Sequence, residues 1–75
     1  MDIAPHISVD AGIHHGAPVI TGTRVPVFLI LGSLAGGMDK DAVIREYALT
    51  KAQLEAALAY AAELVQHTQV TALTA

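Results

Sequence analysis

The chain has no cysteine and few charged residues, and each shortage excludes a way of stabilising a small protein. Without cysteine, neither a disulfide nor a zinc site with thiolate ligands can hold its 75 residues together. A chain this short buries only about 60% of the surface that its unfolded form exposes. Hydrophobic residues make up 53% of the sequence and charged residues 15%, more apolar surface than a small monomer buries. We therefore expect pairing with a second copy.

Positive charge is scarcer than negative charge. Four Lys and Arg residues stand against seven Asp and Glu residues, which gives a net charge of −3. This balance provides no general attraction to phosphate backbones or anionic membranes, so any nucleic-acid contact must be local. The longest uncharged stretch, residues 25–38, is too short to span a membrane. The first residues lack the basic start and apolar run of a secretion signal, so we expect a cytoplasmic protein without membrane contacts.

Residues 7–24 contain short runs of β-branched residues separated by turn formers, which predict two or three very short strands. An isolated hairpin is unstable in water, so these strands must lie against the chain's own helices or against the strands of another copy. We favour pairing across a homodimer. Residues 1–75 form a single domain in this interpretation, with a tail at 68–75 that is either frayed or ordered by a partner.

Residues 26–67 follow a helical period and predict three helices, which makes the fold mainly α. The predicted bounds are about 26–35, 39–47 and 50–66. Asp39 can cap the second helix, because its carboxylate can accept a hydrogen bond from the first turn. Thr50 and Gln53 have the spacing of a capping box at the start of the third helix.

The second and third predicted helices, joined by a turn at residues 48–49, have the spacing of a helix-turn-helix motif. In such a motif the start of the second helix enters the major groove, where polar side chains meet base edges and phosphates. The candidate DNA-binding residues are Lys40, Arg45, Thr50, Lys51 and Gln53. Three acids cancel the three cations of residues 39–51, so the predicted affinity of one copy is low. A three-helix scaffold that binds no DNA is the alternative.

The third predicted helix is apolar nearly all round, which is typical of a helix buried on two sides. One seam is expected to pack on the other two helices: Leu54, Leu58, Ala61 and Val65. The opposite side supplies the candidate dimer interface: Ala52, Ala56, Ala59 and Tyr60. The alternative explanation of this side is that alanine is frequent because it favours helix formation.

Few residues have the chemistry of a catalytic or metal site. There is no cysteine nucleophile, neither serine has a recognisable activating setting, and no glycine-rich phosphate loop precedes a helix. We therefore expect no enzymatic activity and no cofactor. His6, His14 and His15, with Asp10, could in principle ligate zinc, but adjacent histidines of an extended segment point to opposite sides. We expect no metal site.

The most specific pattern is Gly-Ala-Pro-Val-Ile-Thr-Gly-Thr-Arg at residues 16–24. Its signature residues are Gly16, Pro18, Gly22, Thr23 and Arg24. Together with Leu-Ala-Gly-Gly-Met at 34–38 and the alanine-rich residues 56–61, it resembles the family called domain of unknown function 433, from about residue 7 to residue 65. The resemblance implies a homeodomain-like three-helix bundle with an N-terminal β segment, which forms a homodimer. The family is similar in part to VapB-type antitoxins and is often encoded beside a toxin with a PIN-like nuclease fold.

Arg24 is the only Lys or Arg in the first 39 residues, and two roles for it are open. Its guanidinium can bind a partner's carboxylate or a nucleic-acid phosphate. Alternatively, it bonds backbone carbonyls and an acid such as Asp10, and so locks the hairpin onto the first helix. We favour this structural role. Ala17 replaces the lysine that the family usually has there, which removes a positive charge beside Arg24.

These expectations describe an antitoxin-like regulator that binds and neutralises a PIN-like nuclease toxin and regulates its own operon by binding promoter DNA. The alternative is a homodimeric protein-interaction module that binds no DNA. A distant third is a metal-binding protein that uses His6, His14 and His15.

Overall fold

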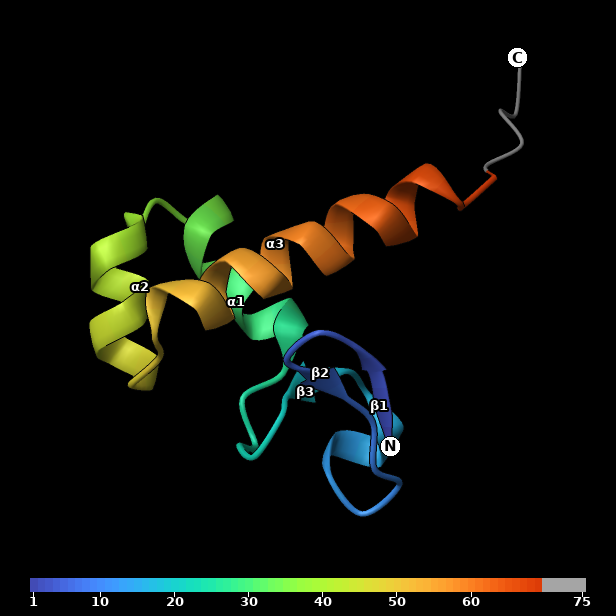
Figure 1. Ribbon diagram of the computed structural model, residues 1–75. Coiled ribbons are helices and arrows are strands. Elements are labelled where there is room, and N and C mark those ends of the chain that lie inside the picture. The colour runs from blue at the N-terminus through green and yellow to red at the C-terminus, as the bar shows by residue number, and fades with distance from the viewer. Residues whose placement is uncertain (70–75) are drawn as a thin grey trace.

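The computed structural model describes residues 1–69, in which a small antiparallel sheet is followed by three helices (Figure 1). The strands, in sheet order, are β1 (Asp2–Ala4), β2 (Ile7–Ser8) and β3 (Val19–Ile20). A short 3-10 turn, η1 (His14–Gly16), precedes β3. The helices are α1 (Val27–Ala35), α2 (Lys40–Tyr47) and α3 (Lys51–Gln66). The mainly α fold with an N-terminal β segment is confirmed.

The helices begin and end close to the predicted residues because their boundaries are encoded locally. Asp39 Oδ1 accepts a hydrogen bond from Ala42 N at 2.8 Å and caps α2. Thr50 Oγ1 accepts from Gln53 N at 3.1 Å, and Gln53 Oε1 accepts from Thr50 N at 2.8 Å, so the predicted capping box of α3 is present. Ala48 adopts a left-handed conformation, with φ of 53°, and ends α2.

The sheet differs from the prediction in two respects. β1 lies before residue 7, where no strand was predicted, and it pairs with β2 in antiparallel register. All three strands pair within one chain, so the expectation that the sheet forms by pairing across a homodimer is wrong for these pairs. The physical reason is that Ile7 and Ile20 place their side chains, fully buried, against the chain's own helices.

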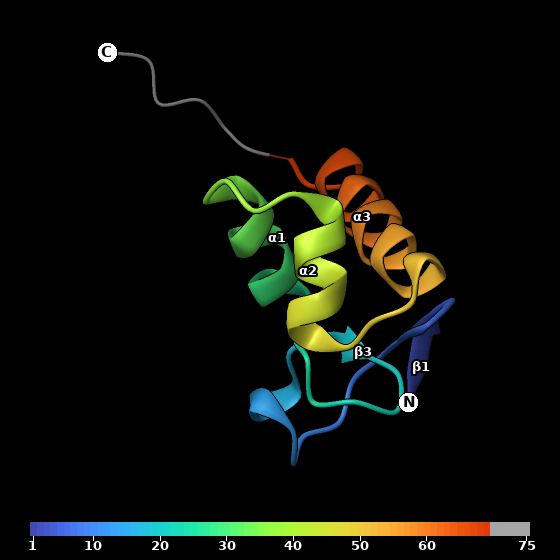
Figure 2. The ribbon, with the colours of Figure 1, turned by 90° about the vertical axis from the view of Figure 1, so that its left-hand side faces the viewer.

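A single core joins the sheet to the helices. Its buried residues are Ile7, Ile20, Val27, Ile30, Val43, Leu49, Leu54 and Ala57. Ser33 Oγ and Tyr47 OH lie 2.7 Å apart and link α1 to α2 beside this core. Figure 2 shows the three helices packed together at one end of the molecule, with the strands and η1 at the other.

The second half of α3 extends beyond the core. In Figure 1 its orange and red turns project past the other elements. The predicted seam is buried at Leu54 and half-buried at Leu58 and Ala61, but Leu64 and Val65 are 54% and 72% exposed. The predicted packing of the seam on the other helices was therefore wrong at Val65, which the described residues leave largely uncovered. Positions 68 and 69 are the only part of the predicted tail that lies within the described residues.

None of the helices in residues 1–69 has the length and apolar character that crossing a bilayer requires.

Candidate functional site

The signature loop, defined here as residues 16–26, is closed by its own hydrogen bonds. Ile20 N donates to Val25 O at 3.0 Å, and Thr23 N donates to Ile20 O at 3.0 Å. The Thr23 hydroxyl donates to Ile20 O at 2.7 Å and accepts from Val25 N at 3.0 Å. Gly22 has a φ of 82°, which side chains disfavour. Gly22 and Thr23 therefore shape the backbone of the tip.

The base of the signature loop is tied to the start of α1. Val27 N donates to Pro18 O at 2.9 Å, and Val19 forms a bridge with Pro26, which caps α1. Gly16 has a φ of 86° and ends η1. Four of the five signature residues thus lie where the loop begins, turns or joins the helix. The fifth, Arg24, is different.

Arg24 is fixed at its backbone and free at its side chain. Its carbonyl accepts a hydrogen bond from His14 Nε2 at 2.9 Å, and its neighbours on both sides belong to the closed tip. Its side chain is exposed, and across residues 1–69 the guanidinium makes no hydrogen bond or ion pair. The expected bonds to carbonyls and to Asp10 are absent there, because Asp10 Oδ1 accepts from Gly12 N at 2.8 Å instead. The favoured structural role of the guanidinium was therefore wrong.

Arg24 lines an open polar hollow of about 440 Å³ between the signature loop and the first strands. Asp2, Asp10 and the terminal residue Met1 also line it. The Met1 amine donates to Val9 O at 2.8 Å. Two carboxylates balance the amine and the guanidinium, so the hollow has no excess of positive charge to attract a phosphate backbone. A protein surface carrying both signs is the better match.

The side chain of His14 bonds to the signature loop, but the three N-terminal histidines do not form a cluster. His6, His14 and His15 all adopt left-handed backbone conformations, with φ of 63°, 48° and 57°. Within residues 1–69 no group of three or more His, Asp or Glu side chains is placed to hold a metal ion. The His14 ring packs edge-on against Phe28, with centroids 6.4 Å apart. The sequence analysis did not single out Phe28. The signal that could have identified it is an aromatic residue that lies between two inward-facing positions of the first helix.

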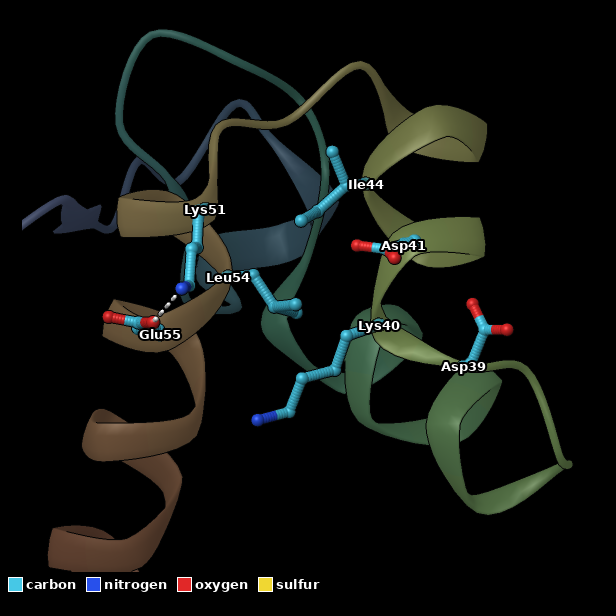
Figure 3. A pocket seen from close by; sticks show the side chains of 7 residues that line it. All are labelled: Asp39, Lys40, Asp41, Ile44, Lys51, Leu54 and Glu55. Atoms are coloured by element: carbon cyan, nitrogen blue, oxygen red, sulfur yellow. Dashed lines mark ion pairs between the residues drawn. The ribbon is translucent and has the colours of Figure 1, made fainter.

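A second candidate site lies between α2 and α3, where a hollow of about 510 Å³ opens (Figure 3). Ile44 and Leu54 face each other between the two helices, and Lys40 reaches into the opening. Lys51 Nζ lies 3.9 Å from Glu55 Oε1, an exposed pair that stabilises the helix little. Three carboxylates and two ammonium groups line the hollow, so its formal charge is −1.

Two of the five candidate DNA-binding residues, Lys40 and Lys51, line this hollow, and two others, Thr50 and Gln53, have their side-chain oxygens engaged. Lys40, Arg45, Thr50 and Lys51 are exposed, whereas Gln53 is half-buried. In the capping box, Thr50 Oγ1 and Gln53 Oε1 each accept one hydrogen bond, which leaves one lone pair on each oxygen, the Thr50 hydroxyl proton and the Gln53 amide protons for other partners. The helix start therefore has part of its hydrogen-bonding capacity already in use.

The four candidate dimer-interface residues occupy two environments on α3. Ala52 and Ala59 are exposed, whereas Ala56 and Tyr60 are half-buried. Tyr60 packs against the core, so part of this side already serves the chain's own fold. The dimer interface at this side stays a prediction.

A family model described as protein of unknown function (DUF433) matches residues 7–61. No curated protein and no solved structure matches the chain. The matched range contains the signature loop, α1, α2 and the first two thirds of α3.

Proposed function

We propose that this chain, which belongs to the DUF433 family of proteins of unknown function, is an antitoxin-like module that binds a partner protein in the cytoplasm. The partner is a PIN-like nuclease toxin encoded beside it, which the module neutralises without enzymatic activity of its own. The resemblance to antitoxins supplies the class of partner. The observation that carries protein binding is the free guanidinium of Arg24 on a loop with a fixed backbone.

A fixed loop favours binding because less conformational freedom is lost when the complex forms. Arginine is also enriched among the residues that dominate protein interfaces, and its planar fork matches a carboxylate. Arg24 O is held by His14, and Thr23 closes the tip beside it, so only the side chain of Arg24 has to be ordered. A carboxylate of the partner is the counterpart that we propose for Arg24.

We propose further that the module acts as a homodimer. The support is its composition, with 53% hydrophobic residues, together with large apolar side chains exposed on α1 and α3. A small monomer that exposes several large apolar groups close together has a surface typical of an interface.

DNA binding is a second candidate function, favoured by Lys40 and Lys51 at the hollow between α2 and α3. We propose that it depends on the partner. A dimer carries twice the net charge of −3, which repels DNA, and a basic partner can supply phosphate contacts that this chain lacks. A complex with two dimers can also occupy neighbouring half-sites, which raises the effective concentration.

Co-expression with the neighbouring gene product tests the proposed function. The full chain should purify with that product and suppress its nuclease activity. Arg24→Gln should weaken the complex about 30-fold, which corresponds to losing an interface arginine worth about 2 kcal/mol. Arg45→Gln is the matched control, because it removes an equally exposed guanidinium from α2 and should bind as the wild type. A neighbouring product that neither binds nor has nuclease activity contradicts the proposal, as does equal binding by Arg24→Gln.

A further inference from the structure

Large apolar side chains gather where the first turn of α1 meets the second half of α3. Phe28 is 61% exposed, and Leu64 and Val65 lie on the projecting part of α3. Between Phe28 and Leu64 is an open hollow of about 150 Å³. Its walls include Pro18, Val27, Phe28, Leu31, Tyr60 and Leu64. We call this surface the α1–α3 groove.

The size and chemistry of the α1–α3 groove suit one apolar side chain. A cavity of about 150 Å³ lined by leucine, isoleucine and phenylalanine is large enough for benzene, so a valine, leucine or phenylalanine side chain fits this volume. Among residues 1–69 no charged residue lines the groove, and α1 carries no charge from Val27 to Ala35. Glu63, which precedes Leu64, is the nearest ionised residue along α3.

We propose that the α1–α3 groove is the interface between two copies of this chain, with Val65 of each copy seated in the groove of the other. This inference rests on the homodimer of the proposed function and locates its interface. In a two-fold interface the same patch faces itself, so charges near the axis meet like charges and repel. The groove avoids this repulsion because its lining is uncharged.

The surface around the α1–α3 groove also combines a projecting apolar side chain with an apolar hollow. Val65 is exposed next to Leu64, which forms part of the groove wall, so each copy presents an apolar projection and an apolar hollow together. Two-fold pairing uses both at once and leaves neither shape exposed.

This interface differs from the alanine side of α3 that the sequence indicated. Ala52 and Ala59 are exposed but offer only methyl groups, whereas Phe28 and Val65 remove far more apolar surface from water when covered. The two surfaces meet at Tyr60, which lines the groove, but Ala52 and Ala59 do not line it. A single charged substitution in each surface therefore shows which of the two is the dimer interface.

Sedimentation equilibrium of the full chain tests the α1–α3 groove, with circular dichroism to check helicity. The wild type should be a dimer at micromolar concentration, and Val65→Glu should raise the dimer Kd at least about 100-fold. Ala59→Glu, a matched control one helix face away, should stay dimeric. If Val65→Glu is dimeric and Ala59→Glu is monomeric, the α1–α3 groove is not the dimer interface, while the homodimer of the proposed function still stands. A folded wild-type monomer overturns both.

Cross-linking covers the case in which Val65→Glu fails to fold. Because the chain has no cysteine, Val65→Cys and Phe28→Cys each carry one thiol. An equimolar mixture of the two should oxidise to a mixed disulfide dimer, whereas a mixture of Ala59→Cys with Phe28→Cys should not. Equal cross-linking in both mixtures overturns the inference. Loss of toxin binding by Val65→Glu with the dimer preserved also overturns it, because the groove then belongs to the partner.

Discussion

The signature loop and the start of α3 both carry the polar residues expected at a binding site, but they use their hydrogen-bonding groups in opposite ways. In the loop, Thr23 bonds to the backbone and leaves Arg24 free. At the start of α3, Thr50 and Gln53 bond to each other's backbone, and Lys51 lies beside Glu55. Within residues 1–69, one region therefore presents an unpaired cation, and the other uses several of its polar groups within its own helix.

This difference bears on which partner each region suits. A free guanidinium on a fixed backbone can bind a new carboxylate without first breaking an existing bond. At the start of α3, Thr50 Oγ1 and Gln53 Oε1 already accept one hydrogen bond each, so a base can use only the remaining lone pairs unless the cap opens, and loss of the cap destabilises the helix by about 1 kcal/mol. The comparison thus favours protein recognition at the loop and leaves α3 with a phosphate contact through Lys51.

The largest effect that tests this comparison is expected for Thr23→Val. Valine keeps the shape of threonine but removes the hydroxyl that donates to Ile20 O and accepts from Val25 N. The half-buried Val25 N–H then lacks a partner, so the free energy of unfolding should fall by about 2 kcal/mol. Urea denaturation of the wild type and the variant measures the change.

Thr21→Val is the matched control for Thr23→Val. Thr21 lies in the same turn but is exposed, and its side chain makes no hydrogen bond within residues 1–69. Its substitution should change the free energy of unfolding by less than about 0.5 kcal/mol. Equal stabilities of the two variants would show that the Thr23 hydroxyl does not close the loop.

The helices could be predicted because their start signals are short-range. Asp39 and the pair Thr50 and Gln53 act on backbone groups within three residues, and a sequence displays such spacings directly. The strands could not be placed equally well. β1 has no periodic pattern of its own, and its position depends on pairing with β2, whose Ile7 is buried by the helices.

The binding surfaces were predicted only in part. The signature marked a loop whose binding role stays a prediction, and it did not indicate that the Arg24 guanidinium makes no hydrogen bond within residues 1–69 or that Asp10 Oδ1 accepts from Gly12 N. For α3, the helical period identified the face that continues from Leu54 to Val65. The helical period of the apolar residues does not indicate how far along α3 other elements pack on this face. The exposure of Val65 was therefore not predictable from the sequence pattern.

A smaller effect is expected on DNA binding, and it tests whether α3 contacts phosphates. With the partner bound, Lys51→Ala should weaken promoter binding about tenfold near 100 mM salt for each phosphate contact that it removes, and it should reduce the salt slope by about one. Gel shifts across a salt series measure both quantities. Gln53 is left unchanged because its loss also breaks the capping box.

Glu55→Gln provides the opposite change for the DNA test. It removes the carboxylate 3.9 Å from Lys51 Nζ, so promoter binding should strengthen. If the complex with the partner gives no promoter shift, or if Lys51→Ala leaves the salt slope unchanged, α3 does not contact DNA and protein interaction alone remains.

The smallest effect is expected for the stability of Arg24→Gln. The guanidinium is exposed and makes no hydrogen bond within residues 1–69, while the bond from His14 Nε2 ends on the Arg24 carbonyl, which every residue retains. The free energy of unfolding should therefore change by less than about 0.5 kcal/mol in urea denaturation. A loss of about 1 to 3 kcal/mol, typical of breaking bonds to buried carbonyls, would restore the structural role and remove the difference between the two regions. Unchanged stability with weakened partner binding would assign the guanidinium to recognition, because a side chain that contributes nothing to folding can affect the complex only through the contact it makes there.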